Sequence, residues 1–116
     1  MSEIDLYSEI QQLMAELSES IKRLRKNGTA LAEAERDYKI TLRQEALKLR
    51  ENDTPVTLIN QVIYGVEGVA DKRFKRDVAQ ANYDANKEFI NITKLKLRIC
   101  ENQIQREYGV SGKGDL

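Results

Sequence analysis

The residues with the most evident chemical potential form a basic run, Lys72-Arg73-Phe74-Lys75-Arg76. Cations clustered around an aromatic ring are typical of a patch that contacts the phosphates of nucleic acid. Neighbouring carboxylates would neutralise such a patch, and we favour a solvated helical face whose charges pair with them. Those carboxylates are Glu45, Glu51, Asp71 and Asp77. The candidate nucleic-acid residues are Lys48, Arg50, Lys72, Arg73, Lys75 and Arg76.

A second basic run, Lys22-Arg23-Leu24-Arg25-Lys26, lies earlier in the chain. If the chain folds back on itself, Lys94 and Lys96 come close to this run, and the like charges would repel unless an anion lay between them. A phosphate or an acidic partner is therefore one alternative. We favour the other, in which the long side chains splay outward and cover the seam with their alkyl stems.

The residue types that catalysis usually needs are missing. The sequence has no His, so imidazole bases and His-ligated metal sites are excluded. Cys100 is the only Cys and has no base to activate it, so we expect a small buried hydrophobe. Glu33, Glu35, Asp37 and Glu45 lack the His that accompanies carboxylates in di-iron sites, so we expect surface charges. We predict no catalytic residue, no cofactor, no metal site and no enzymatic activity.

Length and charge narrow the function classes further. The chain has 116 residues, 19 Lys and Arg, and 19 Asp and Glu, so its net charge is zero. A chain whose positive and negative charges balance is typical neither of a protein that binds DNA through a general positive charge nor of an acidic protein that mimics DNA. The acidic N-terminus lacks the basic start of a signal peptide, and no apolar run approaches the roughly 18 residues of a membrane span. With a single thiol, these features predict a cytoplasmic protein without membrane contact.

The first half of the chain has the periodicity of one long helix. Apolar side chains recur every seven residues. The series continues in phase across Gly28, so we predict one helix over about 3–51, continuous or slightly kinked, rather than two. The series consists of Ile10, Leu17, Leu24, Leu31 and Tyr38.

The second long stretch, about 69–108, also predicts a helix, but with two apolar faces. The broader face contains Phe74, Val78, Ala81, Ala85, Phe89, Ile92, Leu95 and Ile99. The other face contains Ile90, Leu97 and Ile104. A helix with two apolar faces needs two neighbours: the first helix, and a third element or another subunit. We assign Ile90, Leu97 and Ile104 to protein interaction.

A short apolar helix is expected between the two long ones, over about 55–64. Asp53 or Thr54 is a natural N-cap, Pro55 fits the first helical position, and Gly65 fits the position just past the end. Its side chains are too apolar for a solvated turn, so they pack against the hairpin end or contact a partner. They are Val56, Leu58, Ile59, Val62, Ile63 and Tyr64, and we assign them to protein interaction.

These elements predict an all-α fold: an elongated, coiled-coil-like antiparallel helical hairpin with a short third helix at the turn. We expect a single helical domain over 1–108 and a flexible tail over 109–116. Two long helices alone have a thin core, so a homo-oligomer is expected, with a dimer favoured.

Four segments carry a resemblance to known proteins: 49–59, 73–79, 94–99 and 103–109. Together they resemble a group of small helical proteins of phages and prophages of Gram-positive bacteria, found among early genes for replication and recombination. The resemblance implies an accessory role inside the host cell, in the host cytoplasm. It supplies no site residues.

The sequence therefore predicts a non-enzymatic phage-type accessory protein that acts through helix-mediated contacts. It would associate with itself and bind or inhibit a host or phage protein of replication, recombination or defence. The alternative is a nucleic-acid-binding accessory factor that uses the basic patch at the hairpin tip. The dependence of binding on salt distinguishes the two hypotheses, because phosphate binding weakens steeply as the salt concentration rises and an apolar interface does not.

Overall fold

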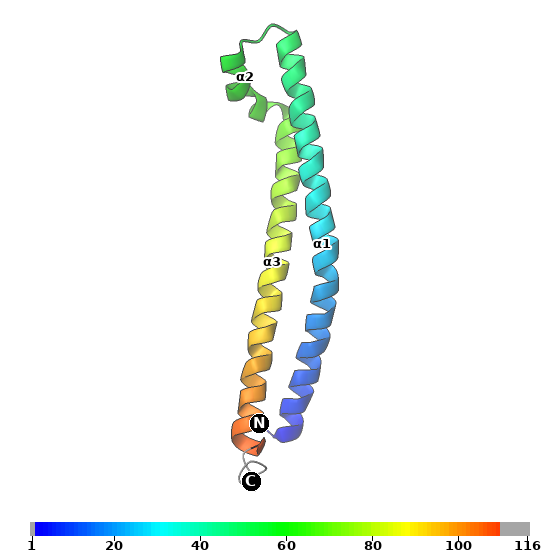
Figure 1. Ribbon diagram of the computed structural model, residues 1–116, viewed down its shortest axis with the longest axis vertical. Helices are drawn as coiled ribbons and strands as arrows, with labels where there is room; N and C mark the ends of the chain where they lie inside the picture. Colours follow the sequence, from blue (N-terminus) through cyan, green and yellow to red (C-terminus); the bar gives the residue numbers. More distant parts are fainter. Residues whose placement is uncertain (1, 110–116) are drawn as a thin grey trace. The chain divides into compact units, whose positions relative to one another are not determined.

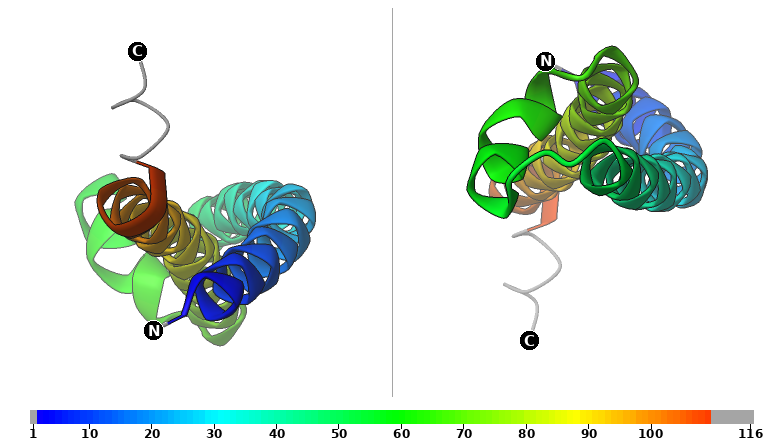
Figure 2. Two further views of the ribbon diagram at one scale, coloured as in Figure 1. Left: turned by 90° about the horizontal axis from the view of Figure 1, so that it is seen from below. Right: turned by 90° about the horizontal axis from the view of Figure 1, so that it is seen from above.

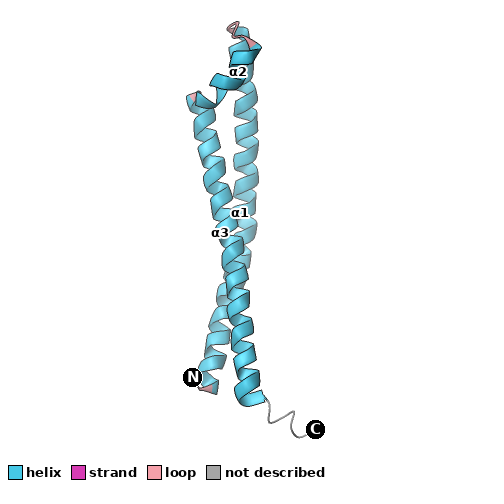
Figure 3. Cartoon of the chain, turned by 90° about the vertical axis from the view of Figure 1, so that its left-hand side faces the viewer, coloured by secondary structure: helices cyan, strands magenta, loops and turns pink. Residues whose placement is uncertain are grey.

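The computed structural model describes residues 2–109, and every regular element within that range is helical (Figure 3). The elements are α1 (Glu3–Glu51), α2 (Val56–Val62), the 3-10 helix η1 (Ile63–Gly65), α3 (Glu67–Ile104) and a π-helical turn η2 (Gln105–Gly109). The predicted all-α helical hairpin with a short helix at the turn is confirmed.

The helix bounds differ from the predicted ones at a few ends. The bounds of α1 are the predicted ones. The short helix begins one residue later than predicted and continues into η1, and α3 begins at Glu67 rather than 69. Gly109, the first residue of the predicted tail, still belongs to η2, and residues 110–116 lie outside the described residues.

The chain divides into two compact units, each with a piece of both long helices. The turn unit is Lys26–Asp84, and the end unit combines Met1–Arg25 with Ala85–Leu116. Within each unit the piece of α1 runs antiparallel to the piece of α3 (Figure 1). That residues 1–108 form a single domain stays a prediction.

The turn unit has a small apolar core built around α2 and η1. Four residues are buried together: Tyr38 of α1, Ile59 of α2, Ile63 of η1 and Val69 of α3. Leu42, Ala46, Leu49 and Val66 pack against them. In Figures 1 and 2, α2 lies beside the last turns of α1 and the first turns of α3. The short helix therefore belongs to the core of this unit through one of its faces.

Asp53 ends α1 instead of capping α2. The N–H of Thr54 donates to the carbonyl of Leu49 and that of Asp53 to Arg50, both at 3.0 Å. This pattern is a Schellman motif, and Asp53 takes the left-handed conformation that the motif requires, with φ 58°. The prediction that Asp53 or Thr54 caps α2 is wrong. Pro55 takes the N-cap position, without a side-chain hydrogen bond.

The end unit has a seam that mixes apolar and polar residues. Leu6 and Leu13 of α1 and Ile90 of α3 are buried. Between the helices, the Asn86 side-chain amide donates to the Ser20 carbonyl at 3.0 Å and to the Ser20 hydroxyl at 2.8 Å, and both residues are buried. A satisfied buried polar pair of this kind fixes the register of two helices at a cost in stability.

Helix α1 continues through Gly28, as preferred from the sequence. A methyl group added at Gly28 would lie 3.3 Å from Cε1 of Tyr83, which is half-buried in the same unit. The contact is tight, but a half-buried ring can tilt by the few tenths of an ångström needed.

Gly28→Ala is therefore expected to raise the free energy of unfolding by about 0.5 kcal/mol, because the gain of about 1 kcal/mol from helix propensity exceeds the adjustment of Tyr83. Urea unfolding followed by circular dichroism measures the change. In a Tyr83→Ala background the same substitution should give the full gain of about 1 kcal/mol. A loss of stability of equal size in both backgrounds would contradict the role given to Tyr83.

Candidate protein-interaction surfaces

The largest candidate surface is a row of apolar side chains along α3, which we name the outer stripe. Its large members are between 43% and 67% exposed, although a two-helix fold normally turns such residues inward. The outer stripe consists of Phe74, Val78, Ala81, Ala85, Phe89, Ile92, Leu95 and Ile99.

The structure reverses the expected roles of the two apolar faces of α3. Ile90 is buried, and Leu97 and Ile104 are half-buried, on the α3 face that forms the seam of the end unit. Asn86 and Thr93 share that face, so it carries fewer apolar residues than the outer stripe. On α1, Ser20 lies opposite this face and is the hydrogen-bond partner of Asn86. The expectation that Ile90, Leu97 and Ile104 form the surplus face is corrected: the outer stripe is the exposed one.

The apolar residues of the short helix divide into a buried and an exposed set. Ile59 and Ile63 are only 7% and 4% exposed and hold α2 and η1 in the core. The remaining four face outward, and we name them the tip surface. The tip surface consists of Val56, Leu58, Val62 and Tyr64.

Two of the four cations of the first basic run are in ion pairs. Arg76 pairs with Asp77 at 2.8 Å, and its guanidinium lies 4.6 Å from the centre of the Tyr38 ring. The hydrogen bonds with Asp77 raise the pKa of Arg76 above its ordinary value. Lys75 pairs with Asp71 at 3.3 Å. The Arg76 side chain therefore packs over the turn-unit core at Tyr38 and also carries a surface charge.

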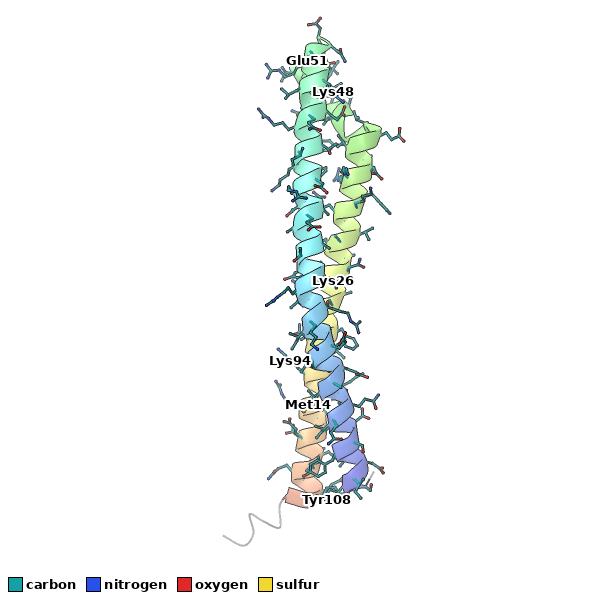
Figure 4. All side chains as sticks on the ribbon, turned by 90° about the vertical axis from the view of Figure 1, so that its right-hand side faces the viewer. Met14, Lys26, Lys48, Glu51, Lys94 and Tyr108 are labelled. Carbon is teal, nitrogen blue, oxygen red and sulfur yellow. The ribbon has the colours of Figure 1, made fainter. Side chains whose placement is uncertain are left out.

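The other four candidate cations differ in their surroundings, and two of them, Lys48 and Lys72, lie beside carboxylates. Lys48 pairs with Glu45 at 3.1 Å, and Figure 4 shows Lys48 in the last turns of α1 near Glu51. Lys72 is half-buried and lines a shallow groove together with Glu33 and Asp37. Carboxylates therefore lie beside Lys48 and Lys72 as well, and they lower the positive potential that phosphates would meet.

Arg73 and Arg50 complete the candidate set. The guanidinium of Arg73 lies 5.4 Å from the centre of the Tyr64 ring, so it borders the tip surface. Arg50 is exposed in the last turn of α1. These two cations are the best placed of the six to meet an anion.

The second basic run lies beside an apolar groove instead of an evident anion site. Lys22 lines a groove of about 340 Å³ in the end unit, together with Met14, Leu17, Ser18 and Ile21 of α1. Figure 4 shows Met14 on α1 and Lys94 on α3 of this unit. The alkyl stem of a lysine at this edge covers apolar side chains of α1. That these stems cover the seam between the two helices stays a prediction.

Cys100 is a free, half-buried thiol of α3, less buried than the small buried hydrophobe expected there. Among residues 2–109, no group of three or more Cys, Asp or Glu residues is arranged to hold a metal ion. No helix in the described part of the chain is long and apolar enough to cross a membrane.

Comparisons with known proteins find no match to this chain among family models, curated proteins or solved structures. The resemblance to small phage proteins therefore stays a hypothesis. The features of the chain that bear on function are the exposed apolar faces of its helices and a basic run in which two of four cations are in ion pairs.

Proposed function

We propose that this chain is a non-enzymatic accessory protein that acts through contacts of its helices with other proteins. The observation that carries the proposal is the outer stripe of α3, with two Phe and four large aliphatic side chains about half exposed. Burial of such side chains stabilises a complex by about 25 cal/mol per Å² of apolar surface, before the cost of association is subtracted. The tip surface offers a second, smaller contact in the turn unit.

The phage resemblance suggests the setting of this activity. In a phage-infected Gram-positive cell, the partner would be a host or phage protein of replication, recombination or defence, bound or inhibited through a shaped helical surface. An inhibitor and a scaffold need the same kind of surface.

The nucleic-acid alternative has weaker support. Ion pairs hold Lys48, Lys75 and Arg76, and carboxylates share the groove of Lys72. Salt-dependent binding requires cations that can exchange counterions for phosphates, and Arg50 and Arg73 are the best placed to do so.

Affinity capture from the lysate of a Gram-positive bacterium, with and without nuclease, tests the proposal. Leu95→Asp alters the outer stripe, Leu58→Asp the tip surface, and Arg50→Glu with Arg73→Glu the basic residues. Arg76 is left in place because it covers Tyr38. Leu47→Asp is the matched control, since Leu47 is an exposed leucine of α1 outside both surfaces.

We expect a protein partner that survives nuclease and 0.5 M salt, is lost in Leu95→Asp or Leu58→Asp, and is kept in Leu47→Asp and in the double Arg variant. Binding that disappears with nuclease and with the double Arg variant, but not with the two Leu variants, would contradict the proposal and favour the nucleic-acid alternative.

A further inference from the structure

We propose that the outer stripe of α3 binds the outer stripe of a second copy of this chain, with the two α3 helices antiparallel. The inference rests on the proposed function, because it takes the outer stripe to be a docking surface and names its occupant. Only the helical register of α3 enters the pairing.

The spacing of the outer stripe is close to that of a second heptad seam. When Glu88 takes the place of Phe89, the positions from Phe74 to Ile99 alternate strictly in steps of four and three residues, and Phe89 lies on the flank of this row. Such alternation keeps a row of side chains on one face of a helix that packs along another helix. The seam positions are Phe74, Val78, Ala81, Ala85, Glu88, Ile92, Leu95 and Ile99. Helix α3 therefore carries one row of side chains that packs on α1 and a second row with the spacing needed to pack on a further helix.

In one antiparallel register each of these positions meets another position of the same seam. Phe74 faces Ile99 of the second copy, and Val78 faces Leu95. Nearer the twofold axis, Ala81 faces Ile92, so a small side chain is opposite a large one. Layers that alternate in size pack without voids.

Glu88 selects this register and this direction. At the centre of the pairing it faces Ala85 of the second copy, where a small side chain leaves room for the carboxylate to reach solvent. Neighbouring antiparallel registers place Glu88 against Val78, Ile92 or Ile99. A parallel in-register pair stacks Glu88 on Glu88 and alanine on alanine, which combines repulsion with voids.

The charges that flank the seam support the same orientation. In the antiparallel register Asp77, which pairs with Arg76 of its own chain at 2.8 Å, also lies beside Arg98 of the second copy, and symmetry provides this contact twice. A parallel pair would place Asp77 near Asn82 instead. Lys75 and Lys96 approach one another in the antiparallel register, but Lys75 already pairs with Asp71 of its own chain. The antiparallel arrangement alone therefore places Asp77 beside Arg98, and the intrachain partner of Lys75 screens its repulsion by Lys96.

Light scattering and analytical ultracentrifugation of the full chain provide the first test. The wild type is expected to be a dimer at high micromolar concentration. Leu95→Asp should weaken the dimer at least about 100-fold, because two buried leucines become charges. Glu88→Leu should tighten it about tenfold or more, and misfolding cannot produce that gain. Leu47→Asp should leave the dissociation constant unchanged.

Charge reversal and cross-linking test the orientation. Asp77→Arg and Arg98→Asp should each weaken the dimer about fivefold, and an equimolar mixture of the two should restore it. In a Cys100→Ala background, a mixture of Val78→Cys and Leu95→Cys should form a disulfide between the two variants, whereas Val78→Cys alone should not cross-link.

Three results would overturn the inference: a wild type that stays monomeric, a Glu88→Leu variant that does not tighten, or a cross-link of Val78→Cys to itself. A monomer whose outer stripe still captures a lysate protein, with loss in Leu95→Asp, overturns the inference and leaves the proposed function intact. A monomer without any partner that depends on Leu95 or Leu58 overturns both.

Discussion

Ile63→Ala is expected to lower the free energy of unfolding by about 3 kcal/mol. Ile63 is 4% exposed and lies in the turn-unit core with Tyr38, Ile59 and Val69. The substitution removes three carbon atoms from a core with few members, so the remaining side chains have little means to refill the space. Urea unfolding gives the change, and amide exchange shows whether α2 and η1 open first.

Val62→Ala is the matched control for Ile63→Ala. Val62 precedes Ile63 in the chain but is 45% exposed on the tip surface. Its truncation should change the free energy of unfolding by no more than about 0.5 kcal/mol. Equal losses from the two substitutions would show that the short helix is not anchored through Ile63.

Asn86→Asp is expected to lower the free energy of unfolding by about 3 kcal/mol at pH 7. The Asn86 amide donates to the Ser20 carbonyl and hydroxyl, and an ionised carboxylate has no donor for the carbonyl. The variant therefore places a buried charge beside an oxygen 3.0 Å away. Unfolding in urea at a series of pH values measures the loss.

The free energy of unfolding that Asn86→Asp loses should become smaller at acidic pH. Burial raises the pKa of the introduced carboxyl group in the folded state above its ordinary value of about 3.9 in the unfolded chain. The folded state is therefore favoured by protonation, and the deficit decreases as the pH falls through the folded-state pKa toward the unfolded one. Asn91→Asp makes the same change at an exposed position of α3 and should show neither the loss nor this pH dependence. A pH-independent loss would mean that the defect is one of packing.

The long helices were predictable because their signals repeat. The heptad series of α1 continues in phase across Gly28, and the stretches 2–52 and 69–108 together hold one Gly and no Pro, so the bounds of α1 and the hairpin architecture follow from the sequence. The apolar run from Val56 to Tyr64 likewise identifies a helix that cannot be left wholly in solvent, and its contact with the hairpin end is one of the two alternatives considered.

The orientation of α3 could not be predicted from apolar content. The outer stripe has more large apolar residues than the face of Ile90, Leu97 and Ile104, yet the poorer face forms the seam. The seam contains the Ser20–Asn86 hydrogen bonds, which join residues 66 positions apart, and helical periodicity within α3 carries no signal of such a long-range pair. The contact of Arg76 with Tyr38 is long-range in the same way, so one member of an apparent phosphate-binding run is in part a structural residue.

Oxidative footprinting of side chains, read by mass spectrometry at increasing chain concentration and with nuclease-treated lysate, tests the central claim most directly. The account predicts that labelling of Phe74, Phe89 and Leu95 falls as partners bind, while labelling of Leu47 on α1 stays constant. Unchanged labelling of the outer stripe and tip surface under all conditions, with protection appearing only around Arg50 and Arg73 when nucleic acid is added, would contradict it.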